Sequence, residues 1–242
     1  MRATTIEYRL RFLIHALIYM LCIWSPWVQR DNLTAKSAWI TLAAYFAEHR
    51  WISFIGAVDL LLVVAIVFAG LGAWFRLWGS AYVGSDVVAS RGMYGAALLA
   101  DGPYRRTRNP LYLGTILFTI GIAPLMPWTG ALIAIVLIWI FQFRLALAEE
   151  TFLAAKFGAP YIAYKTTVPR FLPAPTPLVP AAGQEPRWLQ SLVGELFFVV
   201  YAVILATCGW SFNATLLMRS VLITLGVWCI ARAFLPRVVD ER

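Results

Sequence analysis

The sequence predicts an all-α membrane protein, a polytopic bundle of about six transmembrane helices. Hydrophobic residues make up 61% of its 242 residues and charged residues only 13%, whereas a soluble domain carries roughly 25% charged residues. Apolar runs recur at about the length that a bilayer core requires. No alternation of apolar and polar residues lasts long enough for the strands of a barrel. These observations exclude a soluble enzyme with a single anchor.

The apolar runs give the expected spans in order. The first follows a basic N-terminal segment and precedes no small-residue cleavage site, so we expect a retained span and not a signal peptide. The segment Thr34–Ala47 is apolar but only about fourteen residues long, so we expect an interfacial helix, with a re-entrant piece or a short seventh span as the alternatives. The six expected spans cover residues 10–28, 52–75, 111–127, 130–148, 189–210 and 213–235.

Charge and cysteine usage predict the orientation and exclude some partners. With six spans both termini lie on one side, which holds most of the basic residues; the other side has little beyond Arg30, Lys36 and Arg50. The positive-inside rule places the basic side in the cytoplasm, which for a bacterial protein means the inner membrane. The net charge of +8 therefore suits cytoplasmic loops and anionic lipids, and nucleic acid is not an expected partner. The three cysteines lie in apolar runs, and we expect no metal site.

Three parts are expected along the chain. Residues 1–75 hold the N-terminal spans. Residues 76–173 form a core of a loop, a helical hairpin and a closing segment, and residues 174–242 hold a proline-rich linker and an appended hairpin. The two spans of the core are joined by PLMPWTG, which is too short for anything but a tight antiparallel connection.

Two polar segments lie beside the core hairpin. Residues 101–114 read DGPYRRTRNPLYLG, with Pro110 suited to the first turn of a helix and Asn109 to its N-cap. A helix start also favours anions through its free N–H groups. At the far end of the hairpin, Glu149 and Glu150 repel each other and are poorly placed beside the negative end of a helix dipole.

Topology puts both polar segments on one side, so we expect them to form one site. One carboxylate would hold a cationic ligand group, such as an ammonium or a sulfonium, and Gln142 would share a helix face with Glu149. Two simpler interpretations stay open, a basic loop that only signals topology and a solvated helix end. Arg105 and Arg106 are expected to do no more than mark the cytoplasmic face.

The motifs GPYRRTRNPLY, EE and KFGAPYIAYKTTVPRFLP, in this order around a hairpin, resemble the isoprenylcysteine carboxyl methyltransferase and phospholipid methyltransferase superfamily of integral membrane methyltransferases. The resemblance extends from Leu77 to Pro173. It implies methyl transfer from S-adenosyl-L-methionine to a lipid-like substrate that enters from the bilayer, with the post-hairpin segment closing the cofactor pocket. The cofactor-binding positions that it implies are Ala96, Ala97, Leu98, Leu99, Tyr104, Arg108, Asn109, Pro110, Leu111, Tyr112 and Glu149.

The resemblance also implies roles for these side chains. Glu149 would pair with the methionyl ammonium, while Tyr104 and Tyr112 would pack on the adenine or the sulfonium. Asn109 stands where the superfamily often has a histidine. Because an amide does not titrate, we assign Asn109 to binding and not to proton transfer.

The methyl acceptor stays open between the carboxylate of a prenylcysteine-like compound and a lipid head-group amine. The isoprenylcysteine enzymes carry an arginine for the substrate carboxylate at a position that Leu145 holds here. Arg144 is one residue away and faces about 100° differently on an ideal helix, so it is a weaker catalytic candidate. An amine acceptor would release a proton, and Glu150 is the residue expected to take it.

Two other classes of function stay open. One is an NADPH-dependent membrane reductase of the sterol-reductase type. The other is a transporter or assembly protein without chemistry, which would use the intramembrane charges Asp59, Glu195 and Arg219. The sequence predicts no broken mid-span helix, which argues against a transporter. If the protein is neither a transporter nor an assembly protein, we expect these charges to dock the appended hairpin, with Arg219 paired to Glu195 or Asp59.

Overall fold

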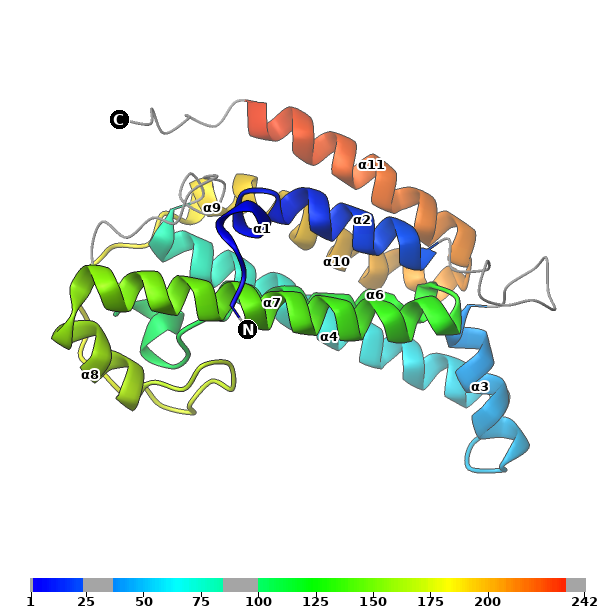
Figure 1. Cartoon of the computed structure of the whole chain (residues 1–242). Helices are drawn as coiled ribbons and strands as arrows, with labels where there is room; N and C mark the ends of the chain where they lie inside the picture. The colour runs from blue at the N-terminus through cyan, green and yellow to red at the C-terminus, as the bar shows by residue number, and fades with distance from the viewer. Residues whose placement is uncertain (1, 24–36, 85–99, 234–242) are drawn as a thin grey trace.

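The computed structural model describes residues 2–23, 37–84 and 100–233, and this part of the chain forms helices and no strand (Figure 1). The elements in chain order are α1 (Thr5–Arg9), α2 (Arg11–Ile23), α3 (Ala38–Glu48), α4 (Phe54–Val83), the 3-10 helix η2 (Gly102–Arg105), α6 (Pro110–Ile122), η3 (Ala123–Leu125), α7 (Trp128–Phe157), α8 (Ala159–Thr167), α9 (Trp188–Gly194), α10 (Leu196–Cys208), η4 (Gly209–Ser211) and α11 (Ala214–Ala233).

Helices α4, α6 and α7 form the centre of the bundle. Helix α2 packs on α7, helices α3 and α10 pack on α4, and α11 packs on α10. The chain reverses between successive long helices, so the start of α2, the end of α4, the start of α6 and the end of α7 lie at one end of the bundle (Figure 1). This end, termed the loop end, therefore brings residues 101–109 and the acidic pair together, as one site requires.

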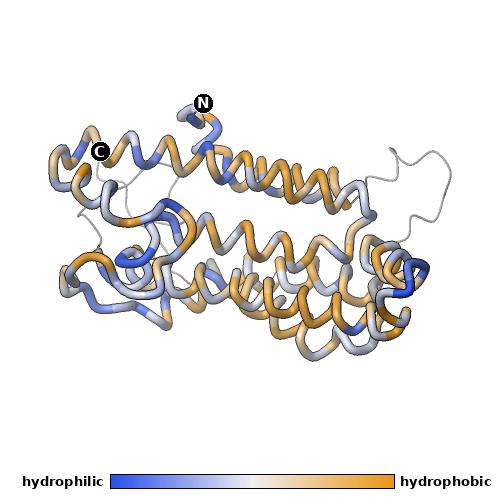
Figure 2. The backbone as a smooth tube through the Cα atoms, turned by 90° about the horizontal axis from the view of Figure 1, so that it is seen from below, coloured by the Kyte–Doolittle hydropathy of each residue, from blue (hydrophilic) through white to orange (hydrophobic). Residues whose placement is uncertain are grey.

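The outer faces of the long helices are apolar. Ile55, Val63 and Leu71 are exposed on α4, as are Val136 and Trp139 on α7. Figure 2 shows hydrophobic residues along the middle of the helices and hydrophilic residues toward the two ends. Helices α4 and α7 are each long and apolar enough to cross a membrane, and α9 with α10 qualifies as one span bent by 74°. The helical membrane bundle is confirmed, whereas the number of six spans stays a prediction.

Two helices are longer than the sequence predicts. Helix α4 continues to Val83 and α7 to Phe157, each beyond the end of its apolar run. Both extensions carry charges that hydropathy assigns to loops, but Arg76 is paired with Glu195 and Glu150 is paired with arginines. Because paired charges can be buried on a packed helix, the helices do not stop where the apolar runs end. The division of the chain into three parts stays a prediction, and α4 runs through its first boundary.

Helix α3 is too short to cross a bilayer. Its 11 residues span about 16 Å, whereas the hydrocarbon core is about 30 Å thick. The start of α3 is tied to the connection between α6 and α7, because the Ala38 amide donates to the Met126 carbonyl at 2.7 Å. An interfacial position for this helix stays a prediction.

Glycines let α4 and α6 pack backbone against backbone. A Cβ added at Gly72 would lie 2.5 Å from the Phe118 nitrogen and 2.7 Å from the Gly114 oxygen, and one at Gly121 would lie 2.5 Å from the Ala69 nitrogen. Real Cβ atoms do not approach backbone atoms this closely, so only glycine fits. Small residues in such positions are a general means of packing membrane helices. The contact fixes the start of α6 against α4.

We expect Gly72→Ala to lower the melting temperature of the detergent-solubilised protein, because α4 and α6 must separate to admit the methyl group. Overpacking of this kind costs about 1–3 kcal/mol. Gly70→Ala is the matched control on the same helix, since a Cβ there would meet nothing within 4 Å. Equal melting temperatures for the two variants would contradict the close packing.

A buried ion pair docks the C-terminal helices on this core. Glu195, at the break between α9 and α10, accepts hydrogen bonds from Arg76 Nε at 2.6 Å and Arg76 Nη2 at 3.1 Å. Arg76 Nη1 donates to Thr115 Oγ1 at 2.7 Å, and the guanidinium lies 4.0 Å from the centre of the Phe198 ring. One guanidinium on α4 thus joins α6 to the junction of α9 and α10.

This pairing differs from the expected one. An ion pair of Glu195 does dock the appended hairpin, but its partner is Arg76, which hydropathy had placed in a loop. Arg219 is exposed on α11, and Asp59 is half-buried on α4. The three charges expected within spans therefore do not converge on one site.

The break between α9 and α10 also corrects the sequence analysis, which predicted no interrupted span. The two helices meet at 74°. A break frees backbone groups that must find other partners, and the Gly194 carbonyl accepts a hydrogen bond from Trp228 Nε1 of α11 at 2.7 Å. The kink is thus stabilised by tertiary contacts, which hydropathy cannot reveal.

The single variant Arg76→Leu should destabilise the protein more than the double variant Arg76→Leu/Glu195→Leu. The single substitution leaves a buried carboxylate unpaired, at a cost of about 3–5 kcal/mol, while the double substitution removes both charges. Thermal unfolding in detergent measures the order. A double variant that melts below the single one would refute the importance of this ion pair for docking.

Candidate active site at the loop end of the bundle

Residues 168–187, termed the strap, lie against the loop formed by residues 101–109. The strap includes the end of the expected closing segment, up to Pro173, and the first part of the expected proline-rich linker. Three backbone hydrogen bonds of 2.9 Å join them: Arg108 N to Pro169 O, Ala174 N to Arg106 O and Leu178 N to Arg105 O. The strap is therefore part of the loop-end structure.

Asp101 anchors the far part of the strap. Its carboxylate accepts hydrogen bonds from the amides of Ala182, Gly183 and Gln184 at 2.9, 3.3 and 3.0 Å. The residue is 3% exposed. A buried carboxylate requires such donors, so the strap backbone and Asp101 depend on each other.

Arg105 and Arg106 hold the strap through its carbonyl groups. Arg105 Nε donates to Val179 O at 2.8 Å, and Arg106 donates to the carbonyls of Ala174 and Pro175. These two arginines were expected only to mark the cytoplasmic face. Their contacts give them a structural role, which the sequence alone did not indicate.

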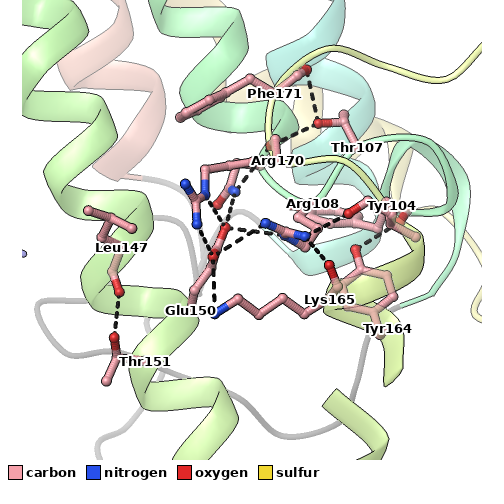
Figure 3. A network of polar contacts seen from close by, with 12 residues as sticks. Tyr104, Thr107, Arg108, Leu147, Glu150, Thr151, Tyr164, Lys165, Arg170 and Phe171 are labelled. Carbon is pink, nitrogen blue, oxygen red and sulfur yellow. Dashed lines mark hydrogen bonds and ion pairs between the residues drawn. The ribbon is translucent and has the colours of Figure 1, made fainter. Parts of the chain in front are cut away.

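Glu150 is the centre of a buried ion-pair network (Figure 3). Arg170 of the strap donates to it from Nε at 2.9 Å and from Nη2 at 3.0 Å, and Arg108 Nε donates at 3.2 Å. Lys165 Nζ lies 3.9 Å away, and Asn109 Nδ2 donates at 3.1 Å. Glu150 is 2% exposed. One carboxylate on α7 therefore holds the loop, α8 and the strap together.

Arg108 also closes the strap with its other donors. Its Nη1 donates to the carbonyls of Lys165 and, at 2.7 Å, Val168. Thr107 Oγ1 lies 3.1 Å from Arg170 O and 3.0 Å from Phe171 O, to which it can donate. Much of the hydrogen-bonding capacity of these two side chains is thus engaged within the protein.

The start of α6 is uncapped. Pro110 occupies the first helical position, as predicted, but Asn109 makes no side-chain capping bond. Its amide instead donates to Glu150 Oε1 and, at 3.2 Å, to Arg170 O. Asn109 was expected as the cap; the buried carboxylate competes for its side chain. Consequently, among the described residues, the N–H groups of Leu111 and Tyr112 have neither an intrahelical acceptor nor a capping side chain.

Glu149 lies in a different environment from its neighbour. Successive helix residues point about 100° apart, so Glu149 faces α6, where Tyr112 donates a hydrogen bond to its Oε2 at 2.7 Å. Within the described ranges, no ion pair includes Glu149. The two adjacent carboxylates are thereby divided between an ion-pair network and a tyrosine-held position.

Two more buried tyrosines lie near Glu149. Burial, and secondly the charge of Glu149, raise the pKa of Tyr8 in α1 and that of Tyr104 in the loop. Both phenols therefore stay protonated at neutral pH and can donate hydrogen bonds. Tyr164 of α8 fixes Tyr104 by donating to its carbonyl at 2.8 Å.

The N-terminal helices contribute residues that the sequence analysis missed. Tyr8 and Arg11 are both 7% exposed, and the Arg11 guanidinium lies 4.5 Å from the centre of the Tyr8 ring. Arg144 Nη2 lies 2.8 Å from both carboxylate oxygens of Glu7, and the hydrogen bond from the Thr4 backbone, with that from Arg144, lowers the pKa of Glu7. Basic residues before a first span are common in membrane proteins, so the sequence did not predict these contacts.

The structure brings most of the predicted cofactor positions to the loop end. Leu145, at the position of the superfamily's substrate arginine, is fully buried in the core. Four expected positions, Ala96, Ala97, Leu98 and Leu99, lie outside the described residues. The others gather around the start of α6 and the end of α7: Tyr104, Arg108, Asn109, Pro110, Leu111, Tyr112 and Glu149. Their roles in binding stay predictions.

These features define a class, a helical membrane protein with a buried acidic site between a helix start and a polar loop. Comparison with known proteins agrees with this class. Residues 60–160 match the phospholipid methyltransferase family. The chain is 29% identical over 113 residues to a protein-S-isoprenylcysteine O-methyltransferase of Schizosaccharomyces pombe. The resemblance to this superfamily of membrane methyltransferases is thus confirmed.

The matches cover only part of the chain, which limits the properties of the relatives that apply to it. The similarity covers 45% of this chain and 48% of the Schizosaccharomyces pombe protein, so the chain matches about half the length of that relative. No solved structure is significantly similar. The family match includes the loop and both glutamates, but neither α1 and α2 nor the strap.

Glu150→Gln should destabilise the loop end, because the substitution leaves Arg108 and Arg170 without their carboxylate. Breaking a buried pair costs about 3–5 kcal/mol. We expect a lower melting temperature and faster proteolysis of residues 168–187. The matched control is Glu149→Gln, one residue away, which keeps an oxygen that can accept the Tyr112 hydroxyl and should melt near the native protein. Equal protease resistance of the strap in the two variants would count against the network.

Proposed function

We propose that the protein is an integral-membrane methyltransferase that uses S-adenosyl-L-methionine to methylate a lipophilic acceptor. The observation that carries the proposal is the environment of Glu149. Glu149 is an acid held by a tyrosine, without an ion pair in the described part of the chain, beside an uncapped helix start. This arrangement lies within the segment that matches the phospholipid methyltransferase family.

The residues at the loop end suit the zwitterionic part of this cofactor. The Glu149 carboxylate would pair with its ammonium group, and the free N–H groups at the start of α6 would meet its carboxylate. Tyr104 and Tyr112 offer aromatic faces for the adenine or the sulfonium. Acidic and anion-binding groups side by side are what an amino-acid zwitterion requires.

The chemical demand on the protein is small. The bound cofactor supplies a methyl group already activated by the sulfonium charge. The side chains of this chain then have to exclude water, orient the partners and balance charge. Arg108, Asn109 and Glu150 support this by holding the loop and the strap against α7. We propose that they act by positioning.

The nature of the acceptor decides whether a base is needed. A carboxylate acceptor releases no proton, whereas an amine does. Glu150 as the proton acceptor stays a prediction, but its three hydrogen-bonded partners, Arg108, Asn109 and Arg170, favour the positioning role. Arg144 is paired with Glu7, which gives no support to a catalytic role.

The acceptor is proposed to be a lipid-like molecule that enters from the bilayer, with the site on the cytoplasmic face. The apolar outer faces of the helices support an approach through the membrane. The superfamily includes enzymes for prenylcysteine carboxylates and for lipid amines. The buried Leu145 at the position of the substrate arginine weighs against a prenylcysteine carboxylate.

Calorimetry of the purified protein with S-adenosylhomocysteine tests the cofactor. We expect measurable binding by the native protein and a loss of about tenfold or more in Glu149→Gln, because a charge-assisted contact with the ammonium is removed. Thr151→Val is the control, since Thr151 is exposed and its hydroxyl bonds only within α7, to the Leu147 carbonyl.

Parallel titration with NADPH separates the alternatives. Binding of NADPH in place of S-adenosylhomocysteine would favour a membrane reductase. No binding of either S-adenosylhomocysteine or NADPH would overturn both enzymatic hypotheses and favour a transporter or assembly protein.

A further inference from the structure

Helix α2 presents a polar stripe to the interior of the bundle. Arg11, His15 and Tyr19 follow each other at intervals of four residues, which places them on one helix face. His15 contacts Gln142 of α7, with 3.1 Å between their Nε2 atoms. Tyr19 contacts Thr119 of α6, with 2.6 Å between their oxygens. The stripe extends from the loop end into the apolar middle of the bundle.

The hydroxyl groups of this stripe are partnered. Thr119 Oγ1 donates to the Thr115 carbonyl at 2.7 Å. The Thr119 hydroxyl proton is therefore engaged with that carbonyl, and Tyr19 must be the donor in the contact between the two hydroxyls. The hydroxyl groups of Tyr19 and Thr119 therefore have hydrogen-bond partners within the protein and need no ligand.

The contact of His15 fixes the orientation of the Gln142 amide. His15 Nδ1 lies 2.5 Å from the Arg11 carbonyl, so Nδ1 carries the proton, and Nε2 of the neutral ring is an acceptor. Gln142 must then turn its NH2 group toward His15. The other amide atom, Gln142 Oε1, is buried and receives no hydrogen bond from the described residues.

A buried carbonyl oxygen without a donor is unusual. Most buried polar atoms in native proteins have a partner, and an exception calls for an explanation. Gln142 is 1% exposed, and the buried residues around it on α7, Ile138, Phe141 and Leu145, are apolar. A water molecule would need two to four polar partners, whereas the polar contact of this amide with the described residues is the one with His15, whose Nε2 is itself an acceptor.

The position of Gln142 relates it to the proposed cofactor site. It precedes Glu149 by seven residues, which is two turns or about 10 Å along the same face of α7. A molecule whose reacting group lies near Glu149 could therefore place a second polar group beside Gln142, within the apolar part of the bundle.

We propose that Gln142 Oε1 accepts a hydrogen bond from a hydroxyl or N–H group of the methyl acceptor, a single-chain amphiphile lodged between α2, α6 and α7. This inference rests on the proposed function, because it identifies the bound amphiphile with the methyl acceptor. Gln142 then determines specificity, since it favours acceptors with a donor over analogues without one. His15 acts as a positioning residue that aims the amide.

The probes for the test are 1-hexadecanol and hexadecyl methyl ether, which share a chain and an oxygen but differ in the donor. Binding to the full-length protein in mixed micelles is followed by the shift in melting temperature across a titration. We expect the native protein to bind the alcohol about two- to tenfold more tightly, which is the range that one net hydrogen bond gives. In Gln142→Leu, the preference should fall to nearly one.

The control is Thr119→Val, which removes a buried hydroxyl that already has its partners and should keep the preference. His15→Phe should weaken the preference, because it frees the amide to turn, and His15→Asn is expected to restore part of it. No preference in the native protein, or a preference that persists in Gln142→Leu, would overturn the inference.

Calorimetry with S-adenosylhomocysteine distinguishes failure of this inference from failure of the proposed function. Gln142→Leu should bind S-adenosylhomocysteine as the native protein does, because Gln142 lies two turns from Glu149. Loss of the alcohol preference with intact binding of S-adenosylhomocysteine supports the assignment. Loss of S-adenosylhomocysteine binding in Gln142→Leu would overturn it, since Gln142 would then belong to the cofactor site.

Discussion

The buried carboxylate of Glu150 is the interaction on which the loop end of the bundle depends. A carboxylate at 2% exposure is tolerated only with charged and hydrogen-bonded partners. These partners come from three separate places, Arg108 and Asn109 of the loop, Lys165 of α8 and Arg170 of the strap. The loop, α8 and the strap thus supply the charges that let α7 carry a buried carboxylate beyond its apolar run.

The same network explains why two adjacent glutamates can differ in role. The cations gather on the face of α7 that carries Glu150, and helix geometry turns Glu149 about 100° away from them. Glu149 is then left with a hydrogen bond from Tyr112, near the buried tyrosines Tyr8 and Tyr104. The polar site at Glu149 thus lies beside Glu150, whose carboxylate is already paired with cations.

Patterns local to the sequence predicted much of this structure, and contacts between distant residues account for what was missed. Hydropathy and turn length were sufficient for the helical membrane bundle, the core hairpin and the meeting of both polar segments at one end. The ion pair between Arg76 and Glu195 joins residues 119 positions apart, which no local pattern encodes. The part of the strap after Pro173 was expected as a plain linker because it binds through backbone groups, which every sequence possesses.

The parts of the chain outside the family match bear on the choice of acceptor. The matched segment, residues 60–160, holds the loop and both glutamates, and a shared cofactor needs no more than such a common core. Arg170 and His15 lie outside it, on the strap and on α2, yet Arg170 pairs with Glu150 and His15 contacts Gln142 of α7. The match to the Schizosaccharomyces pombe protein covers 48% of that relative, so its substrate does not determine the methyl acceptor proposed for this chain.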